Sequence, residues 1–106
     1  MNLGYLLNNM KCNRDMTAIV SEGREYTFGD IYREYSKVKE ILKDEGIGDG
    51  NVVSIIAEFS PASIAFFVAL IEKNVIVVPI SKAIKNVEDY IRISESEYVI
   101  DLRKVD

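Results

Sequence analysis

The sequence contains no histidine and no tryptophan, and cysteine occurs once in 106 residues. Without histidine, the chain cannot build a Cys–His nucleophile pair or a Cys/His zinc site from its own residues. The single thiol, Cys12, cannot form an internal disulfide, so nothing indicates a disulfide-stabilised secreted scaffold. We interpret Cys12 as an incidental side chain near the N-terminus.

Long uncharged hydrophobic runs and clusters of basic residues are also missing. The most apolar stretch, residues 61–80, is interrupted by Glu72, Lys73 and Asn74, whereas a membrane-spanning helix needs about 20 largely uncharged residues. Residues 1–8 lack the basic start of a signal peptide. A net charge of −4 without a Lys/Arg stripe disfavours binding to nucleic acid or to a membrane surface. We therefore expect a cytoplasmic protein that binds neither.

The composition that is present is that of one small globular domain. Hydrophobic residues make up 48% of the chain and charged residues 28%, which is enough for a core and is not typical of a disordered chain. A chain of this length forms one domain at most. Because so small a domain buries a modest share of its surface, we expect marginal stability.

The N-terminal part of the chain predicts a helix and a β-hairpin. Residues 3–10 can form a short helix with its apolar side chains on one face. β-branched and aromatic residues indicate strands at 17–21 and 24–27, and Glu22-Gly23 between them is a turn signal. A hairpin this short must pack against another part of the molecule.

Residues 28–45 show the clearest helical period of the sequence, with apolar residues on one face and charged residues on the other. Thr27 is placed to cap this helix, and Asp30 follows at the spacing of a capping box. Gly46 is expected to end the helix in a left-handed conformation.

The second half of the chain alternates strands and helices. The expected strands are 52–57, 75–78 and 98–100, and the expected helices are 61–72 and 87–94. This alternation, with strands that are nearly apolar throughout, favours a parallel sheet with right-handed crossovers. We predict an α/β fold: a three-stranded parallel βαβαβ layer with helices on both faces, preceded by a β-hairpin and an amphipathic helix.

Local signals set the expected boundaries of these elements. Ser60 and Pro61 suit the cap and first position of the helix at 61–72. Pro79 is expected to end the strand before it, and Asn86 to cap the last helix. In that helix Val87, Tyr90 and Ile91 are expected to face inward, with Ile93 a further candidate.

The carboxyl ends of parallel strands are where α/β folds place their ligands, and here they carry Glu58, Ser81 and Asp101. A pair of carboxylates could hold Mg²⁺, as in a phosphoacceptor-like domain. We favour the simpler interpretation that Glu58 and Asp101 are solvated strand-end residues, because no further pattern supports a metal site.

Two loops are candidates for phosphate sites. Residues 58–61 contain no glycine and carry the bulky Phe59, unlike a nucleotide-binding turn. The helix start at Ser60 could attract an anion, although capping alone explains it better. Residues 46–50 are glycine-rich but lie between a helix and a strand, the reverse of the order that aims amides at phosphate, so we interpret them as a turn.

The aromatic residues could suggest a ligand cage, but their spacing places most of them on faces that need core contacts, with Phe59 the least determined. They are Tyr26, Phe28, Tyr32, Tyr35, Phe59, Phe66, Phe67, Tyr90 and Tyr98. We therefore assign no catalytic, cofactor-binding or metal-binding residue within the chain.

Four segments resemble consecutive parts of the adenylate-forming (AMP-binding) enzymes, the superfamily of acyl-CoA synthetases, peptide-synthetase adenylation domains and luciferases. Residues 26–31 (YTFGDI) resemble its first motif, an aromatic-Thr-aromatic run that leads into a helix. Residues 46–53 (GIGDGNVV) resemble its Gly-Val-x-x-Gly-Asp-x-Val turn, with the Asp and Gly transposed and Asn51 where Asp is usual.

Residues 70–80 (LIEKNVIVVPI) resemble the second motif, in which a helix, a small turn and a strand ending in Pro follow one another. Lys73-Asn74 replaces the usual Ala-Gly, and Ser81 stands where Asp is common. Residues 91–100 fit the next family segment, so the resemblance covers roughly residues 18–101.

The resemblance implies an enzyme that activates a carboxylic acid with ATP, releases pyrophosphate, and passes the acyl group to coenzyme A or to the phosphopantetheine of a carrier protein. The full-length enzyme would use ATP and Mg²⁺. The family's phosphate loop, its nucleoside-binding residues and its catalytic lysine lie downstream of the region that this chain resembles, so no residue role is carried over.

The same resemblance implies that residues 1–106 are a single partial domain, the opening part of a large N-terminal domain whose sheet helps wall the acyl pocket. We expect a scaffold that is inactive alone, whose partner is the remainder of its own chain, and which can self-associate through an uncovered face. The alternative is a stand-alone α/β binding module.

Overall fold

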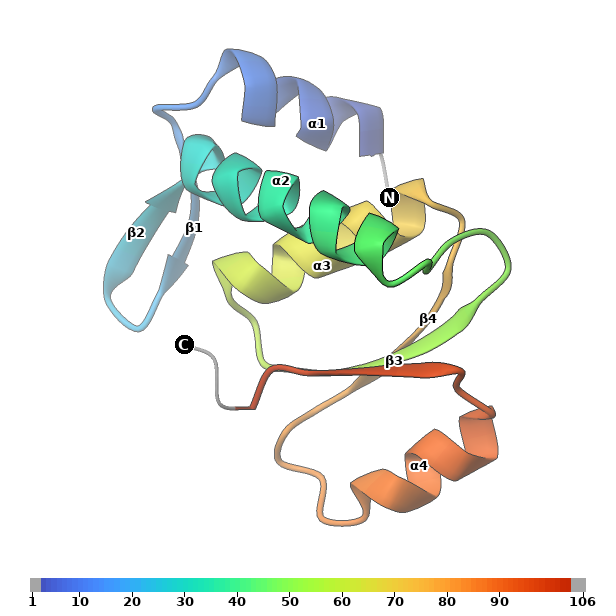
Figure 1. Ribbon diagram of the computed structural model, residues 1–106. Helices are drawn as coiled ribbons and strands as arrows, with labels where there is room; N and C mark the ends of the chain where they lie inside the picture. Colours follow the sequence, from blue (N-terminus) through green and yellow to red (C-terminus); the bar gives the residue numbers. More distant parts are fainter. Residues whose placement is uncertain (1–2, 104–106) are drawn as a thin grey trace.

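The computed structural model describes residues 3–103, which form a three-stranded parallel sheet, a separate hairpin and four helices (Figure 1). In chain order the elements are α1 (Leu3–Cys12), β1 (Thr17–Ser21), β2 (Arg24–Thr27), α2 (Phe28–Asp44), β3 (Val52–Ile56), α3 (Pro61–Glu72), β4 (Ile76–Ile80), α4 (Val87–Ser94) and β5 (Tyr98–Asp101). Both the element order and the α/β class agree with the sequence prediction.

β1 and β2 form the predicted antiparallel hairpin. Glu22 and Gly23 both have left-handed backbone angles, with φ of 52° and 77°, and two such residues give the twist that short hairpins require. Gly29, at the start of α2, is tied to the connector before the hairpin because its amide donates to the carbonyl of Arg14 (2.9 Å). A Cβ on Gly29 would lie 3.1 Å from that oxygen, so glycine permits the close approach.

α2 begins with the predicted capping box. The Asp30 amide donates to the Thr27 hydroxyl oxygen (3.1 Å), and the Thr27 amide donates to the Asp30 carboxylate (2.8 Å). Gly46 follows the helix with a φ of 71°, as predicted. The apolar face is buried, with Ile31, Val38 and Leu42 no more than 2% exposed.

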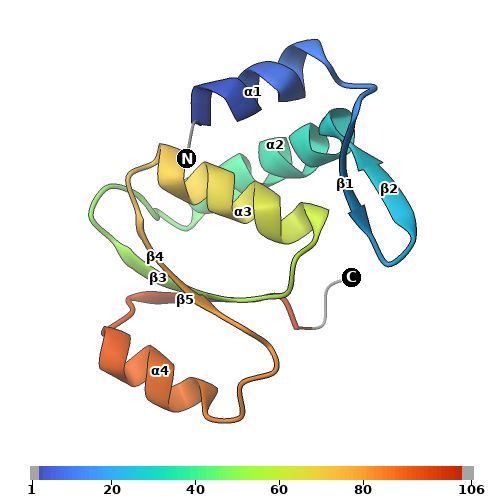
Figure 2. The same cartoon turned by 180° about the vertical axis from the view of Figure 1, so that it is seen from behind.

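The parallel sheet has the strand order β4-β3-β5, so β3 is central and pairs with both of the others. Figures 1 and 2 show α1, α2 and α3 on one side of this sheet and α4 on the other. The larger core lies on the three-helix side, and the smaller one joins Ile56, Ile80 and Val87 beneath α4. Helices therefore cover both faces, as predicted.

Three local predictions were wrong. Pro79 does not end its strand but lies within β4, paired with Ile55, because β4 is an edge strand whose outer side needs no amide donor. Tyr90 and Ile93 do not face inward, since α4 is one short helix over a narrow sheet and leaves them 47% and 76% exposed. Asn86 makes no side-chain capping bond to α4.

Across residues 3–103, no helix combines the length and apolar character needed to cross a membrane.

Candidate functional site at the carboxyl edge of the sheet

The three parallel strands end side by side, with Ile56 in register with Ile80 on one side and with Asp101 on the other. From β3 the chain crosses to β4 through α3, and from β4 it returns past β3 to β5 through α4 on the opposite face. The direction of winding thus changes between β3 and β5. In α/β folds the carboxyl edge at such a point is the usual ligand position.

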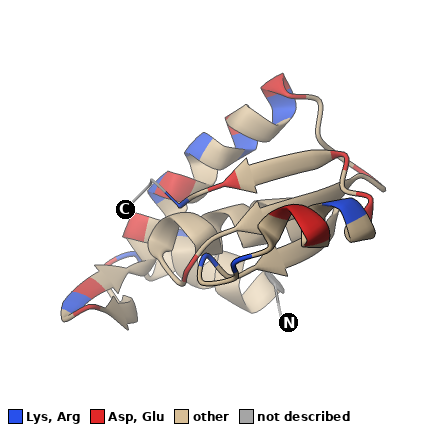
Figure 3. Cartoon of the chain, turned by 90° about the horizontal axis from the view of Figure 1, so that it is seen from below, with Lys and Arg blue, Asp and Glu red and all other residues tan. Residues whose placement is uncertain are grey.

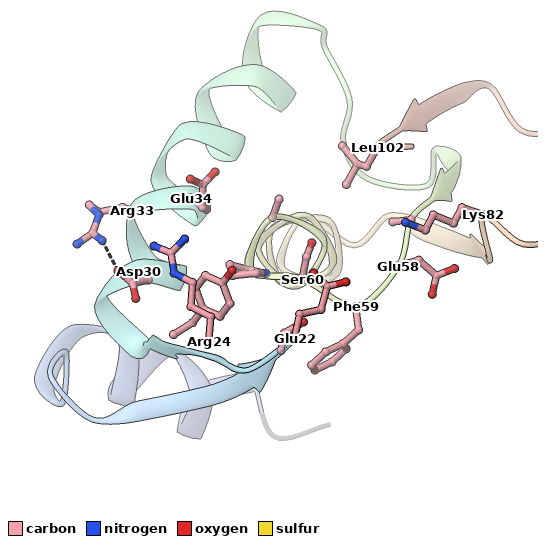
Figure 4. Close-up of a pocket in the computed structure, with 15 residues that line it drawn as sticks. Glu22, Arg24, Asp30, Arg33, Glu34, Glu58, Phe59, Ser60, Lys82 and Leu102 are labelled. Atoms are coloured by element: carbon pink, nitrogen blue, oxygen red, sulfur yellow. Dashed lines mark hydrogen bonds and ion pairs between the residues drawn. The ribbon is translucent and has the colours of Figure 1, made fainter. Parts of the chain in front are cut away.

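A polar hollow of about 450 Å³ lies at this edge (Figure 4). It is bounded by the hairpin turn, the first turns of α2 and the loop between β3 and α3. Its charged lining residues are Glu22, Arg24, Asp30, Arg33, Glu34, Glu58 and Lys82. No local pattern predicts this hollow, because its walls come from four segments that are about 20 or more residues apart in the chain.

Two of the basic residues that line the hollow have partners in its wall. Arg33 forms an ion pair with Asp30, and the Arg24 guanidinium lies 5.0 Å from the centre of the Tyr26 ring. The backbone N–H of Thr27 is the main cause that lowers the pKa of Asp30, with burial opposing it and the Thr27 hydroxyl and Arg33 helping. Figure 3 shows acidic and basic residues interspersed along the described chain. The lining of the hollow carries four carboxylates and three basic groups, so its charge does not strongly favour an anion or a cation.

Glu58 and Asp101, the candidate magnesium ligands, are engaged with their neighbours. The Ser81 hydroxyl donates to the Glu58 carboxylate (3.0 Å), and Arg103 donates to both Asp101 oxygens through its guanidinium. That bidentate contact also raises the pKa of Arg103. No group of three metal-ligating side chains occurs within the described part of the chain. This arrangement fits the strand-end interpretation better than a metal site.

The loop from β3 to α3 has the geometry of a helix cap. The Ser63 amide donates to the Ser60 hydroxyl oxygen (3.1 Å), and the Ser60 amide donates to the Ser63 hydroxyl oxygen (2.9 Å). The first-turn amides that could face an anion are thus partly used. Phe59 also projects from this loop, and Figure 4 labels it beside Ser60.

The glycine-rich residues 46–50 lie at the opposite, amino end of β3. The Gly48 amide donates to the Asn51 side chain (2.9 Å) and the Gly50 amide to the Asn74 carbonyl (3.1 Å). These amides hold a turn, as predicted.

The aromatic residues do not gather into a cage. Tyr35 is 4% exposed and stacks on Tyr32, with ring centres 5.9 Å apart. Phe66 packs against the larger core. Phe59 and Tyr90 are the exposed members of the set, at 64% and 47%.

Phe59 also borders a second, apolar hollow of about 300 Å³. Its walls come from α1 and α3, including Leu6, Ile64, Phe67 and Val68. Ala57, Glu58 and Phe59 line both hollows. No local pattern predicts whether Phe59 is exposed, because an aromatic residue in a loop can equally pack inward.

Comparison with known proteins gives relatives of much greater length. Acetyl-coenzyme A synthetase from Penicillium chrysogenum is 35% identical over 63 residues, covering 54% of this chain and 9% of that protein. The Emericella nidulans enzyme of the same name is 39% identical over 49 residues, covering 46% of this chain and 7% of that protein. The chain thus spans less than a tenth of the curated relatives that it matches.

Solved structures share the fold. The N-terminal subdomain of Klebsiella oxytoca NpsA superposes with a TM-score of 0.77 at 18% identity, over 96% of this chain and 28% of that one. VinN superposes with a TM-score of 0.78 at 15% identity, over 92% of this chain and 26% of that one. The family model described as AMP-binding enzyme matches residues 6–105. Because that match takes in nearly every element of the fold, the chain belongs to the AMP-binding enzyme family.

Proposed function

We propose that this chain is the opening part of the large N-terminal domain of an ATP-dependent ligase that activates a carboxylic acid. The complete enzyme would form an acyl-adenylate and release pyrophosphate, then transfer the acyl group to the thiol of coenzyme A or of a carrier-protein phosphopantetheine. The observation that carries the proposal is the family match over residues 6–105, on a fold that superposes on adenylation subdomains. The relatives named as acetyl-coenzyme A synthetases and an adenylation–carrier di-domain support it.

In this proposal the 106 residues act as scaffold and have no turnover of their own. The loop after β3 is a serine cap with a projecting Phe59, and the carboxylates Glu58 and Asp101 are bonded to Ser81 and Arg103. Within residues 3–103 these groups do not fit a triphosphate or its magnesium ion. The ATP chemistry would therefore lie in the remainder of the polypeptide.

ATP–pyrophosphate exchange tests the proposal. Labelled pyrophosphate should enter ATP when the full-length ligase is given its carboxylic acid, and no label should enter with the 106-residue chain. Exchange by the short chain would contradict the scaffold role.

The alternative is a stand-alone α/β binding module. Sequencing the source gene past the codon for Asp106 separates the two. A long open frame with a Ser/Thr/Gly-rich loop followed by lysine favours the ligase, and a stop codon favours the module.

A further inference from the structure

Phe59 stands at the junction of the two hollows. It follows β3 at the carboxyl edge and lines both the polar hollow and the apolar one. Figure 4 shows Phe59 among the residues that line the polar hollow. Phe59 is 64% exposed and borders an apolar depression, and an exposed aromatic side chain continuous with an apolar hollow is a feature of protein interaction surfaces. We call residues 57–59, with Ile64 and Phe67 of α3, the Phe59 edge.

The apolar hollow has few free polar groups with which to bind a ligand. Ser63, in its wall, already donates its hydroxyl to the Ser60 carbonyl (3.0 Å), and Glu58 accepts the Ser81 hydroxyl. The other walls are hydrocarbon, including Ile64 and Phe67. Such a site suits one or two large apolar side chains better than a polar small molecule.

The comparison with longer proteins indicates what could occupy the apolar hollow. This chain corresponds to 28% of the NpsA subdomain and 26% of VinN, so those molecules carry most of their polypeptide beyond the shared part. β5 brings the described chain back to the Phe59 edge, since the Leu102 amide donates to the Ile56 carbonyl (2.9 Å) and Leu102 lines the polar hollow. Polypeptide that follows β5 in a longer protein therefore starts beside this surface.

We propose that, in the full-length ligase, the Phe59 edge is the docking surface for the polypeptide that follows Asp106, which places apolar side chains against Phe59 and in the apolar hollow. The inference rests on the proposed function, because it requires the remainder of a ligase chain. It assigns to Phe59 the role of an interface anchor.

Ile93 provides a matched control. It is 76% exposed and apolar like Phe59, but it lies on α4, which covers the opposite face of the sheet. Phe59→Ser and Ile93→Ser both replace an exposed apolar side chain by a small polar one. A general effect of surface polarity would change the two variants alike.

The experiment compares thermal unfolding of both variants in the full-length ligase and in the 106-residue chain. We expect Phe59→Ser to lower the unfolding temperature of the ligase by about 3 °C or more, and to change that of the short chain by less than about 1 °C. Ile93→Ser should leave the ligase within about 1 °C of the parent. Hydrogen–deuterium exchange should show residues 57–68 more protected in the ligase than in the short chain.

Three results would overturn the inference. Phe59→Ser could leave the ligase unaffected, Ile93→Ser could destabilise it equally, or residues 57–68 could exchange equally fast at both lengths. A Phe59-dependent dimer of the short chain, with no effect of Phe59→Ser on the ligase, would identify a second copy as the occupant instead. The parent ligase is also assayed for pyrophosphate exchange, so that a failure of the proposed function is recognised separately from these outcomes. A gene that ends at Asp106 would overturn both this inference and the proposed function.

Discussion

The Tyr35 hydroxyl donates to the Glu72 carboxylate at 2.5 Å, joining the middle of α2 to the last residue of α3. Tyr35 is 4% exposed and Glu72 is exposed, so a buried ring carries its polar end to the rim of the helix pair. Burial is the main cause that raises the pKa of Tyr35, and the bond to Glu72 adds to it. The contact thus links α2 to α3 at the edge of their shared apolar core.

Tyr35→Phe should lower the free energy of unfolding by about 1 kcal/mol at pH 7, because one hydrogen bond to a charged but solvated acceptor is lost. The raised pKa means that the folded state holds this proton more tightly. The stabilisation is complete below pH 10 and declines as the pH rises above it. Urea unfolding of both proteins from pH 7 to 11 checks this, and Tyr90→Phe, at an exposed position, should match the parent at pH 7. An unchanged stability of Tyr35→Phe at pH 7 would count against the contact.

Asp30→Asn should lower the free energy of unfolding by roughly 0.5 kcal/mol at pH 7, because the capping side chain loses its negative charge. The effect is small because this side chain is already 31% exposed to solvent. The pKa of Asp30 is lowered in the folded state, so its contribution is present above pH 4 and is lost as the pH falls through the lowered value. The variant should therefore lose less stability than the parent between pH 5 and pH 2. Circular dichroism during acid titration measures this, with exposed Glu40→Gln as the control. Parallel acid profiles for the parent and Asp30→Asn would refute it.

Three hydrogen-bonded serines connect the end of α4 to the central strand. Ser54 of β3 is fully buried, with its hydroxyl oxygen 2.5 Å from that of Ser96, and Ser96 lies 2.7 Å from Ser94. Ser54→Ala should destabilise the chain by about 1 kcal/mol, because Ser96 loses its buried partner. Chemical denaturation measures the change, and exposed Ser36→Ala should be neutral or slightly stabilising because alanine favours helices. Equal stabilities of Ser54→Ala and the parent would show that the serine cluster contributes nothing.

Two departures from the family pattern contact each other. The Asn74 side-chain amide donates to the Asp49 carboxylate (2.9 Å), and Asn74 has a left-handed φ of 64°. Glycine suits that backbone better but cannot make the bond. Asn74→Gly should therefore be more stabilising in an Asp49→Ala background than in the parent, by about 0.5 kcal/mol. A double-mutant cycle by urea unfolding gives this coupling, and a value of zero would mean that the two substitutions are independent.

The capped helices and the hairpin were predictable because their signals are local. Thr27 and Asp30 are three residues apart, and Glu22-Gly23 is a two-residue turn, so neither depends on distant parts of the chain. The alternation of apolar strands and helices likewise gave the parallel layer. In each case the periodicity and the turn chemistry agree with the fold.

The errors concern properties that depend on what lies beside a residue in space. A proline usually ends a strand, but Pro79 is accommodated within β4 because β4 lies at the edge of the sheet. The strand order β4-β3-β5, which places β4 at that edge, cannot be predicted from any local sequence pattern. The exposure of Tyr90 and Ile93 depends on how much sheet α4 has to cover. The two hollows beside Phe59 depend on where the hairpin and α1 come to rest against α2 and α3.

The central position of β3 also orders the events of synthesis. The ribosome delivers β3 before α3 and β4, and β5 is the last strand of the sheet to emerge. Both edges of the most buried strand therefore stay unpaired until about 25 further residues have been made on one side and about 45 on the other. During that interval the nascent chain exposes an apolar, aggregation-prone strand. Chaperones that bind such segments would therefore bind this protein first at β3.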